Sequence, residues 1–353
     1  MSLHSNYSLR FSLLLLLTFP FFGFGVYLRA QNTDPSFFSQ LYSEEVKPLE
    51  AELSLDMKTF LKNKNKEEYQ EGRLSYLDPT TNEKRSWEVE LRPRGNMRKS
   101  ISYIPPIMIK FKKDALKKEG LSNFNKLKLV AQYRSGILAE QYVLKEFHAY
   151  RLYNQLSPYS FRVQLIRLTL TDLGGKKKPI KYWGFLIEPE EEMAERLNGV
   201  IVEREKARTS FLEEKEYKRM CLFEYMIGNT DWAIGNSHNI KFLKVPALDK
   251  LVPVPYDFDY AGMVNASYAA PFHTLPIKRV TERLYRGETF SEEDMNEFLP
   301  PFEEKHDKLV QLLQSCPYMD SRNKRYTTQY IESFFQECKN KKSMAYALRK
   351  VDY

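Results

Sequence analysis

Asp231 and Asn239 lie eight residues apart in the segment GNTDWAIGNSHN. Transfer of a phosphoryl group to a hydroxyl requires a carboxylate that orients the nucleophile and accepts its proton. It also requires a neutral oxygen ligand that helps to hold magnesium. Asp231 and Asn239 supply these two kinds of group in a turn-rich loop. The alternative is a structural loop in which both side chains cap turns.

Two further carboxylates, Asp257 and Asp259, bracket Phe258 in the segment PYDFDYAG, which begins sixteen residues after Asn239. In an extended strand, residues i and i+2 point to the same side, so both carboxylates can face one metal ion. A lone D-x-D pair is a weak signal of function. Its combination with the preceding Asp-x7-Asn spacing and a short strand predicts a metal site formed by Asn239, Asp257 and Asp259.

The elements that would position these residues can be read from hydrophobic periodicity and turn residues. A helix with Phe37, Phe38 and Leu41 is expected first, and the helix that follows the early strands should end before Pro158. An apolar helix is expected immediately before the Asp231 loop, and further helices from residue 291 onward. The two main helices are expected at 137–156 and 214–228. The expected strands are a hairpin within 65–92, then 107–111, 125–131, FRVQLIRLTLTD, YWGFLIE, IKFLKV and LVPVPYD.

This order of elements predicts an α+β fold with two lobes. Residues 31–190 form a strand-rich N-lobe in this interpretation, and residues 191–353 form a helical C-lobe that carries the catalytic and metal-binding loops. Ligands tend to bind in the cleft between such lobes.

The order GNTDW…HN, apolar strand, PYDFDYAG resembles the spore coat protein H (CotH) kinase family, and more distantly the HipA-type kinases, over roughly residues 90–290. The resemblance implies a bilobal, atypical protein-kinase-like fold and ATP-dependent phosphorylation of protein hydroxyls with Mg²⁺ or Mn²⁺. It also implies that Asp231 is the catalytic base, that Asn239 is a metal ligand and that Asp257 is the metal-binding aspartate, with Asp259 assisting.

The segment LRPRGNMRKS resembles the RGN segment of CotH proteins. By this resemblance Gly95 allows close backbone approach to a nucleotide, and Arg94 reaches a phosphate. Small hydroxyl residues usually follow RGN in the family, whereas Met97 and Arg98 follow here. Without the resemblance, the segment would be interpreted as a turn.

Lys110 lies inside the apolar strand IMIKF, where a lysine needs a partner or a ligand. Kinases place such a lysine against the nucleotide phosphates and pair it with a helix glutamate. Glu140 is the expected partner, because it borders the apolar face of the 137–156 helix, and Glu146 is the weaker choice. The alternative is that Lys110 faces solvent on an alternating strand.

Residues 1–30 show the pattern of a secretory signal peptide, with Arg10 before an uncharged apolar run at 11–27 and a small residue, Ala30, before Gln31. We therefore expect export to the periplasm or the medium, or membrane anchoring through residues 11–27 if the signal is not cleaved. Three cysteines are present, and Cys316 and Cys338 are a possible pair in an oxidising compartment.

The formal net charge is +8, of which the first thirty residues supply +2. This modest excess fits a phosphate-bearing ligand, and no motif of alternating basic and aromatic residues suggests a nucleic acid. The expected partners are a nucleotide and a protein substrate. Two alternatives to an active kinase remain: a nucleotide-binding pseudokinase, or a structural envelope protein that kept the fold.

Overall fold

The computed structural model describes residues 34–204 and 206–351. The expected signal peptide at 1–30, including its apolar run, lies outside the described residues. Among the helices that are described, none combines the length and the apolar character needed to cross a membrane.

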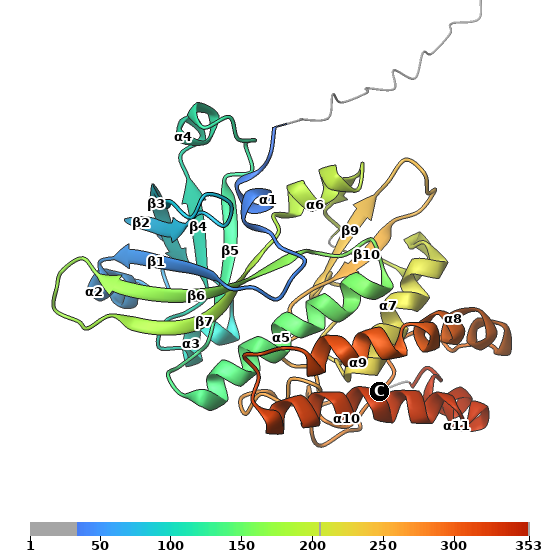
Figure 1. Cartoon of the computed structure of the whole chain (residues 1–353). Coiled ribbons are helices and arrows are strands. Elements are labelled where there is room, and N and C mark those ends of the chain that lie inside the picture. Colours follow the sequence, from blue (N-terminus) through green and yellow to red (C-terminus); the bar gives the residue numbers. More distant parts are fainter. Residues whose placement is uncertain (1–33, 205, 352–353) are drawn as a thin grey trace, which may run out of the picture. The chain divides into compact units, whose positions relative to one another are not determined.

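The first part of the described chain forms a seven-stranded closed barrel with the strand order β1-β2-β3-β4-β5-β7-β6 (Figure 1). Neighbouring strands are antiparallel except β1 and β6, which are parallel and close the barrel. The alternating burial along β1 and β3 reflects an apolar inner face and a more polar outer face. The strands are β1 (Leu49–Leu55), β2 (Gln70–Leu77), β3 (Lys84–Pro93), β4 (Ile107–Phe111), β5 (Lys126–Ala131), β6 (Val163–Asp172) and β7 (Ile180–Ile187).

The expected hairpin is confirmed, because β2 pairs with β3 around a turn in which Asp78 Oδ1 accepts hydrogen bonds from the backbone N–H groups of Thr80 and Thr81. The mixed α+β composition is also confirmed. What the sequence did not predict is the closure of the strands into a barrel. It depends on β1, a strand that was not expected, and on its pairing with β6, more than a hundred residues later.

Helix α5 (Ile137–Leu156) has the bounds expected from the sequence. It begins after Gly136, whose φ of 114° suits glycine, and it ends before Ser157 and Pro158. In Figure 1, α5 lies between strand β7 and the helices α7 (Glu214–Ile227) and α9 (His306–Gln314), and residue contacts join it to all three. Almost every residue from Ala139 to Tyr153 is buried, so the helix has no broad solvent face.

The second half of the described chain combines helices with a three-stranded sheet of order β10-β9-β8. This sheet and helix α7 flank the Asp231–Asn239 loop and the segment with Asp257 and Asp259, which the sequence analysis identified as candidate catalytic and metal-binding segments. The sheet strands are β8 (Val200–Val202), β9 (Ile240–Lys244) and β10 (Val252–Pro255). The remaining elements are α1 (Phe37–Leu41), α2 (Met57–Lys62), α3 (Met97–Ile101), α4 (Lys113–Lys118), α6 (Glu190–Arg196), the 3₁₀ helix η1 (Thr209–Phe211), α8 (Glu292–Glu304), α10 (Ser321–Cys338) and α11 (Lys341–Ala347).

Two hydrophobic cores stabilise this arrangement. One fills the barrel and receives Phe37 and Phe38 from α1. The other lies among α5, α7, the three-stranded sheet and the C-terminal helices. Strands β6 and β7 contribute alternate residues to both cores. The three cysteines are buried and free, so the structure does not pair Cys316 with Cys338.

Candidate functional site

The β9–β10 pair brings the two sequence motifs to one end of the three-stranded sheet. Ile240 is opposite Pro255 in the register, and beyond this pair the N–H of Tyr256 donates to the carbonyl of Asn239 at 3.0 Å. Asn239 precedes β9 and Asp257 follows β10, so the hairpin places them at the same end. Both have left-handed backbone conformations, with φ of 55° and 64°, which Asn and Asp adopt more readily than most residues.

Asp231 and Asn239 are in direct contact. The Nδ2 group of Asn239 donates to the backbone carbonyl of Asp231 at 2.7 Å and to its Oδ2 at 3.1 Å. His238 Nε2 donates to Oδ1 of the same carboxylate at 2.9 Å. The Asp231 side chain is about one-third exposed, so a substrate can reach it. The Asp-x7-Asn spacing therefore corresponds to a loop that folds back to hold one carboxylate.

The turn after α7 fixes this loop from its other side. The helix ends at Gly228 in a left-handed conformation, and the N–H of Asn229 donates to the carbonyl of Glu224 at 2.8 Å. Asn229 Oδ1 then accepts from the N–H of Asp231 at 3.0 Å.

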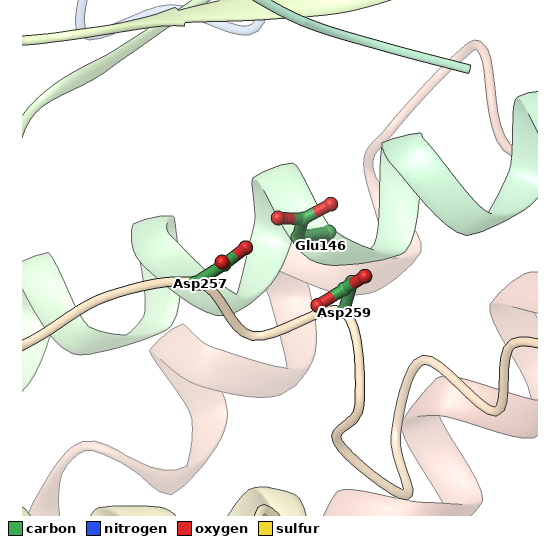
Figure 2. A group of neighbouring side chains, drawn as sticks. All are labelled: Glu146, Asp257 and Asp259. Carbon is green, nitrogen blue, oxygen red and sulfur yellow. The ribbon is translucent and has the colours of Figure 1, made fainter. Parts of the chain in front are cut away.

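Asp257 and Asp259 lie beside a third carboxylate, Glu146 of α5 (Figure 2). One oxygen of each of the three groups lies within 4.8 Å of one oxygen of each of the others. Figure 2 shows that the group is assembled from α5 and from the segment after β10, which are far apart in sequence. The N–H of Asp257 donates to the hydroxyl oxygen of Tyr150, one turn further along α5, at 2.8 Å. We refer to Glu146, Asp257 and Asp259 as the acidic triad.

The acidic triad is buried and incompletely satisfied. Glu146 is 0% exposed, and its Oε1 has no hydrogen-bond partner among the described residues. Asp259 is 5% exposed, and its Oδ2 accepts from Tyr268 Oη at 3.1 Å. Burial raises the pKa of both carboxyl groups, although the nearby Arg98 acts in the opposite direction. Groups in this position favour a partner that brings positive charge.

Arg98 is the cation that contacts the acidic triad in the described part of the chain. Its Nε donates to Asp259 Oδ2 at 2.7 Å, and its Nη2 donates to Glu146 Oε2. Burial would lower the pKa of Arg98, but the charges of Asp259 and Glu146 outweigh it and raise this pKa well above its ordinary value. One guanidinium thus links the α3 segment, α5 and the segment after β10.

The RGN segment positions Arg98 at the start of α3. Gly95 has a φ of 84°, a conformation that glycine adopts without steric cost, and the N–H of Arg94 donates to the carbonyl of Pro106 at 2.8 Å. The side chain of Arg94 is half-buried, with no hydrogen bond or ion pair to the rest of the described chain. Its charge acts on Lys128 and Tyr256, which places it near the site rather than within the acidic triad.

The structure does not bring Lys110 and Glu140 together. Lys110 pairs with Glu90 on the neighbouring strand at 2.7 Å and lies over the ring of Tyr69, so it belongs to the outer face of the barrel. The glutamate that α5 turns toward the acidic residues is Glu146, which the sequence interpretation ranked below Glu140. The expected pairing is wrong because alternation along β4 directs Ile109 and Phe111 inward and Lys110 outward.

Lys128 on β5 is the more buried lysine near the site. It forms an ion pair with Glu190 at the start of α6, and its Nζ lies 5.6 Å from the ring centre of Tyr256, the residue before Asp257. Burial lowers its pKa, against the effect of Glu190. Lys241 also pairs with Glu190, at 3.0 Å.

The acidic triad fits a hard divalent cation such as Mg²⁺ or Mn²⁺. Carboxylate and amide oxygens are the ligands that these ions prefer. The unpartnered Glu146 Oε1 provides an oxygen that a cation would satisfy. The structure brings Asp257 and Asp259 together with Glu146 and sets Asn239 at the same end of the sheet, and their role as metal ligands stays a prediction.

The sequence interpretation ranked Glu146 below Glu140 and gave Arg98 no role at the site, for identifiable reasons. Glu146 was assigned to a different side of the helix from the Val143/Leu144 face, yet it lies three residues after Val143 and four before Tyr150. That spacing puts all three on one helix face and could have identified Glu146. Arg98 was considered only as a departure from the usual RGN sequence.

Comparisons with known proteins give weak structural similarities and no sequence family. No protein-family model matches the chain, and no curated protein matches it. A Helicobacter pylori structure described as the proinflammatory kinase CtkA aligns with a TM-score of 0.39 and 10% identity, over 73% of this chain and 94% of that chain. A chain from the Shewanella oneidensis MR-1 HipA, HipB and operator DNA complex aligns with a TM-score of 0.31 and 13% identity. That match covers 66% of this chain and 62% of the other, so the chain spans less than two thirds of it.

Proposed function

We propose that this chain is an exported, CotH-like atypical kinase that transfers a phosphoryl group from ATP to a protein hydroxyl with the help of Mg²⁺ or Mn²⁺. The observation that carries the proposal is the acidic triad at the sheet end that also holds the paired Asp231 and Asn239. The resemblance of these segments to CotH sequences supports the same assignment.

Each group has a role that its position allows. Asp231 is partly exposed and held from both sides, so it can orient an acceptor hydroxyl and take up its proton. Asp257, Asp259, Glu146 and Asn239 would hold the divalent cation, which when bound would neutralise negative charge on the phosphates. The side chain of Arg94, which has no hydrogen bond or ion pair among the described residues, would bind a phosphate at the edge of the site.

The proposal is tested by the thermal stability of residues 31–353 with ATP and Mg²⁺. ATP and Mg²⁺ together should raise the melting temperature, and Asp257→Asn should abolish this shift because it removes a cation ligand without opening a core cavity. Asp249→Asn, at an exposed position in the turn between β9 and β10, is the matched control and should keep it. Absence of any shift in the unmodified protein would exclude the proposed nucleotide site.

A second candidate is a protein that binds the nucleotide without transferring phosphate. It is favoured by the engagement of both carboxylate oxygens of Asp231, which accept from His238 and Asn239. The two candidates differ in incorporation of labelled phosphate into protein. Incorporation that disappears in Asp231→Asn while the ATP-dependent thermal shift remains would identify a kinase. No incorporation with a retained shift would identify the binding protein.

Export is proposed from residues 1–30. The full-length chain should be recovered outside the cytoplasm, and N-terminal sequencing of that material should begin at Gln31 if the signal is cleaved. Recovery with Met1 retained and in the membrane fraction would indicate the anchored form instead.

A further inference from the structure

Among the described residues, Arg98 is a largely enclosed cation that pairs only with acids proposed here as metal ligands. It touches Glu146 and Asp259, and its side chain is 11% exposed. With all three carboxyl groups of the acidic triad ionised, their formal charge is −3, and Arg98 contributes +1. The remaining charge of −2 is balanced by one divalent cation.

The position of Arg98 has two opposite effects on a bound cation. It neutralises part of the negative charge and so reduces the repulsion among the three carboxylates of the acidic triad. It also repels any second cation at the same oxygens, and this repulsion is strong where water is excluded. Glu146 Oε2 and Asp259 Oδ2 are already used by the guanidinium. A cation that binds these oxygens competes with the guanidinium for their charge.

The α3 segment is built so that Arg98 can leave. None of the residues of α3 is buried, so movement of this helix exposes no apolar core. Its other side-chain contacts are superficial: Lys99 pairs with the exposed Glu67 at 3.3 Å, and Lys64 Nζ donates to the carbonyl of Ser100 at 3.4 Å. Gly95 lies just before the helix with a positive φ, and the chain can pivot most easily at glycine.

We propose that Arg98 is an exchangeable counter-cation of the metal site. Without metal, it neutralises Glu146 and Asp259. When a divalent cation enters with a nucleotide, Arg98 releases these carboxylates and its guanidinium binds phosphate oxygens, which it can contact in a bidentate manner. The inference rests on the proposed function, because it takes the acidic triad as the metal site. It adds that affinity for the bare cation is held low while affinity for the cation–nucleotide complex is held high.

The test is Mn²⁺ binding, measured by electron paramagnetic resonance on purified residues 31–353. Arg98→Gln should bind Mn²⁺ alone at least about tenfold more tightly than the unmodified protein, because a competing charge is lost from a water-poor site. The same variant should bind the Mn²⁺–ATP complex more weakly than the unmodified protein, because a phosphate ligand is lost. Lys99→Gln, the next residue on α3, is the matched control and should change neither affinity by more than about twofold.

The outcomes separate this inference from the proposed function. If neither the unmodified protein nor Arg98→Gln binds Mn²⁺, the metal site itself is wrong. If the unmodified protein binds Mn²⁺ and Arg98→Gln binds it equally or more weakly, the counter-cation role is wrong. If Arg98→Gln binds both Mn²⁺ and Mn²⁺–ATP more tightly, the exchange onto phosphate is wrong. Should Arg98→Gln fail to fold, Arg98→Lys keeps the charge without the planar fork, and its affinity for Mn²⁺–ATP should still fall.

Discussion

Glu146 differs from the other glutamate considered on α5 in burial and in its partners. Glu146 is fully buried with one unpartnered oxygen, whereas Glu140 is half-buried in the first turn and forms no ion pair within the described chain. Glu146→Gln keeps the shape of the side chain and removes its charge. We expect it to weaken Mn²⁺ binding at least about tenfold, as loss of a ligand group does, while Glu140→Gln leaves the affinity unchanged. Calorimetric titration of both variants measures this, and an equal loss in the two would contradict the role of Glu146.

Glu224, near the end of α7, predicts how the free energy of unfolding depends on pH. It is fully buried, and burial raises its pKa from 4.5 to about 8, against the effect of Asn229 and with a smaller contribution from the charge of Asp231. Between these values the folded protein binds more protons than the unfolded chain, so the free energy of unfolding falls as pH rises. Glu224→Gln removes this contribution.

The measurement for Glu224 is urea unfolding of both proteins between about pH 5 and about pH 8. The stability difference, unmodified protein minus Glu224→Gln, should fall by on the order of 1–3 kcal/mol across this range. Taking the difference cancels the other titrating groups, which both proteins share. A difference that is constant or grows with pH would show that Glu224 does not carry a raised pKa.

The end of α7 is the element that sets the Asp231 loop. Gly228 has a φ of 68°, and a Cβ at this position would lie 2.0 Å from Tyr330 Oη of α10. Gly228→Ala therefore combines backbone strain with a steric clash, and we expect a loss of about 2 kcal/mol or more in the free energy of unfolding. ATP-dependent stabilisation should weaken as well, since Asn229 and Asp231 follow directly. Gly235→Ala, with no atom within 4 Å of the added Cβ, should change stability by less than about 0.5 kcal/mol in the same denaturation assay.

Local elements were predictable from the sequence because their signals are local. The bounds of α5 follow from hydrophobic periodicity and Pro158, and the β2–β3 hairpin follows from alternation around a turn-forming aspartate. The contact between Asp231 and Asn239 was also within reach, because both lie in one short loop.

Contacts between distant segments were not predictable in the same way. Closure of β1 onto β6 joins strands with more than a hundred residues between them, and no local pattern encodes that register. Which side chains of β4 point into the barrel is decided by barrel closure, and this closure leaves Lys110 on the outer face. The link from Arg98 to Glu146 and Asp259 spans three segments for the same reason.

At the scale of the whole described chain, the two hydrophobic cores share the same strands. On β6, Leu165 belongs to the core around α5 and Ile166 to the barrel core. On β7, Phe185 and Leu186 divide in the same way. A strand cannot leave one core while it keeps its register in the other, because its side chains alternate between the two faces. The barrel and the helical part should therefore unfold together.

This coupling predicts a single calorimetric transition for residues 31–353. Leu53→Ala in the barrel core and Leu222→Ala in the core around α7 replace side chains that are both fully buried. Each should cost about 2–5 kcal/mol, and each should move the whole transition to lower temperature without splitting it. Two resolved transitions, with Leu53→Ala shifting only one of them, would show that the cores are independent. In that case the acidic triad would belong to the part that holds α5 and α7, and Arg98 would belong to the other part.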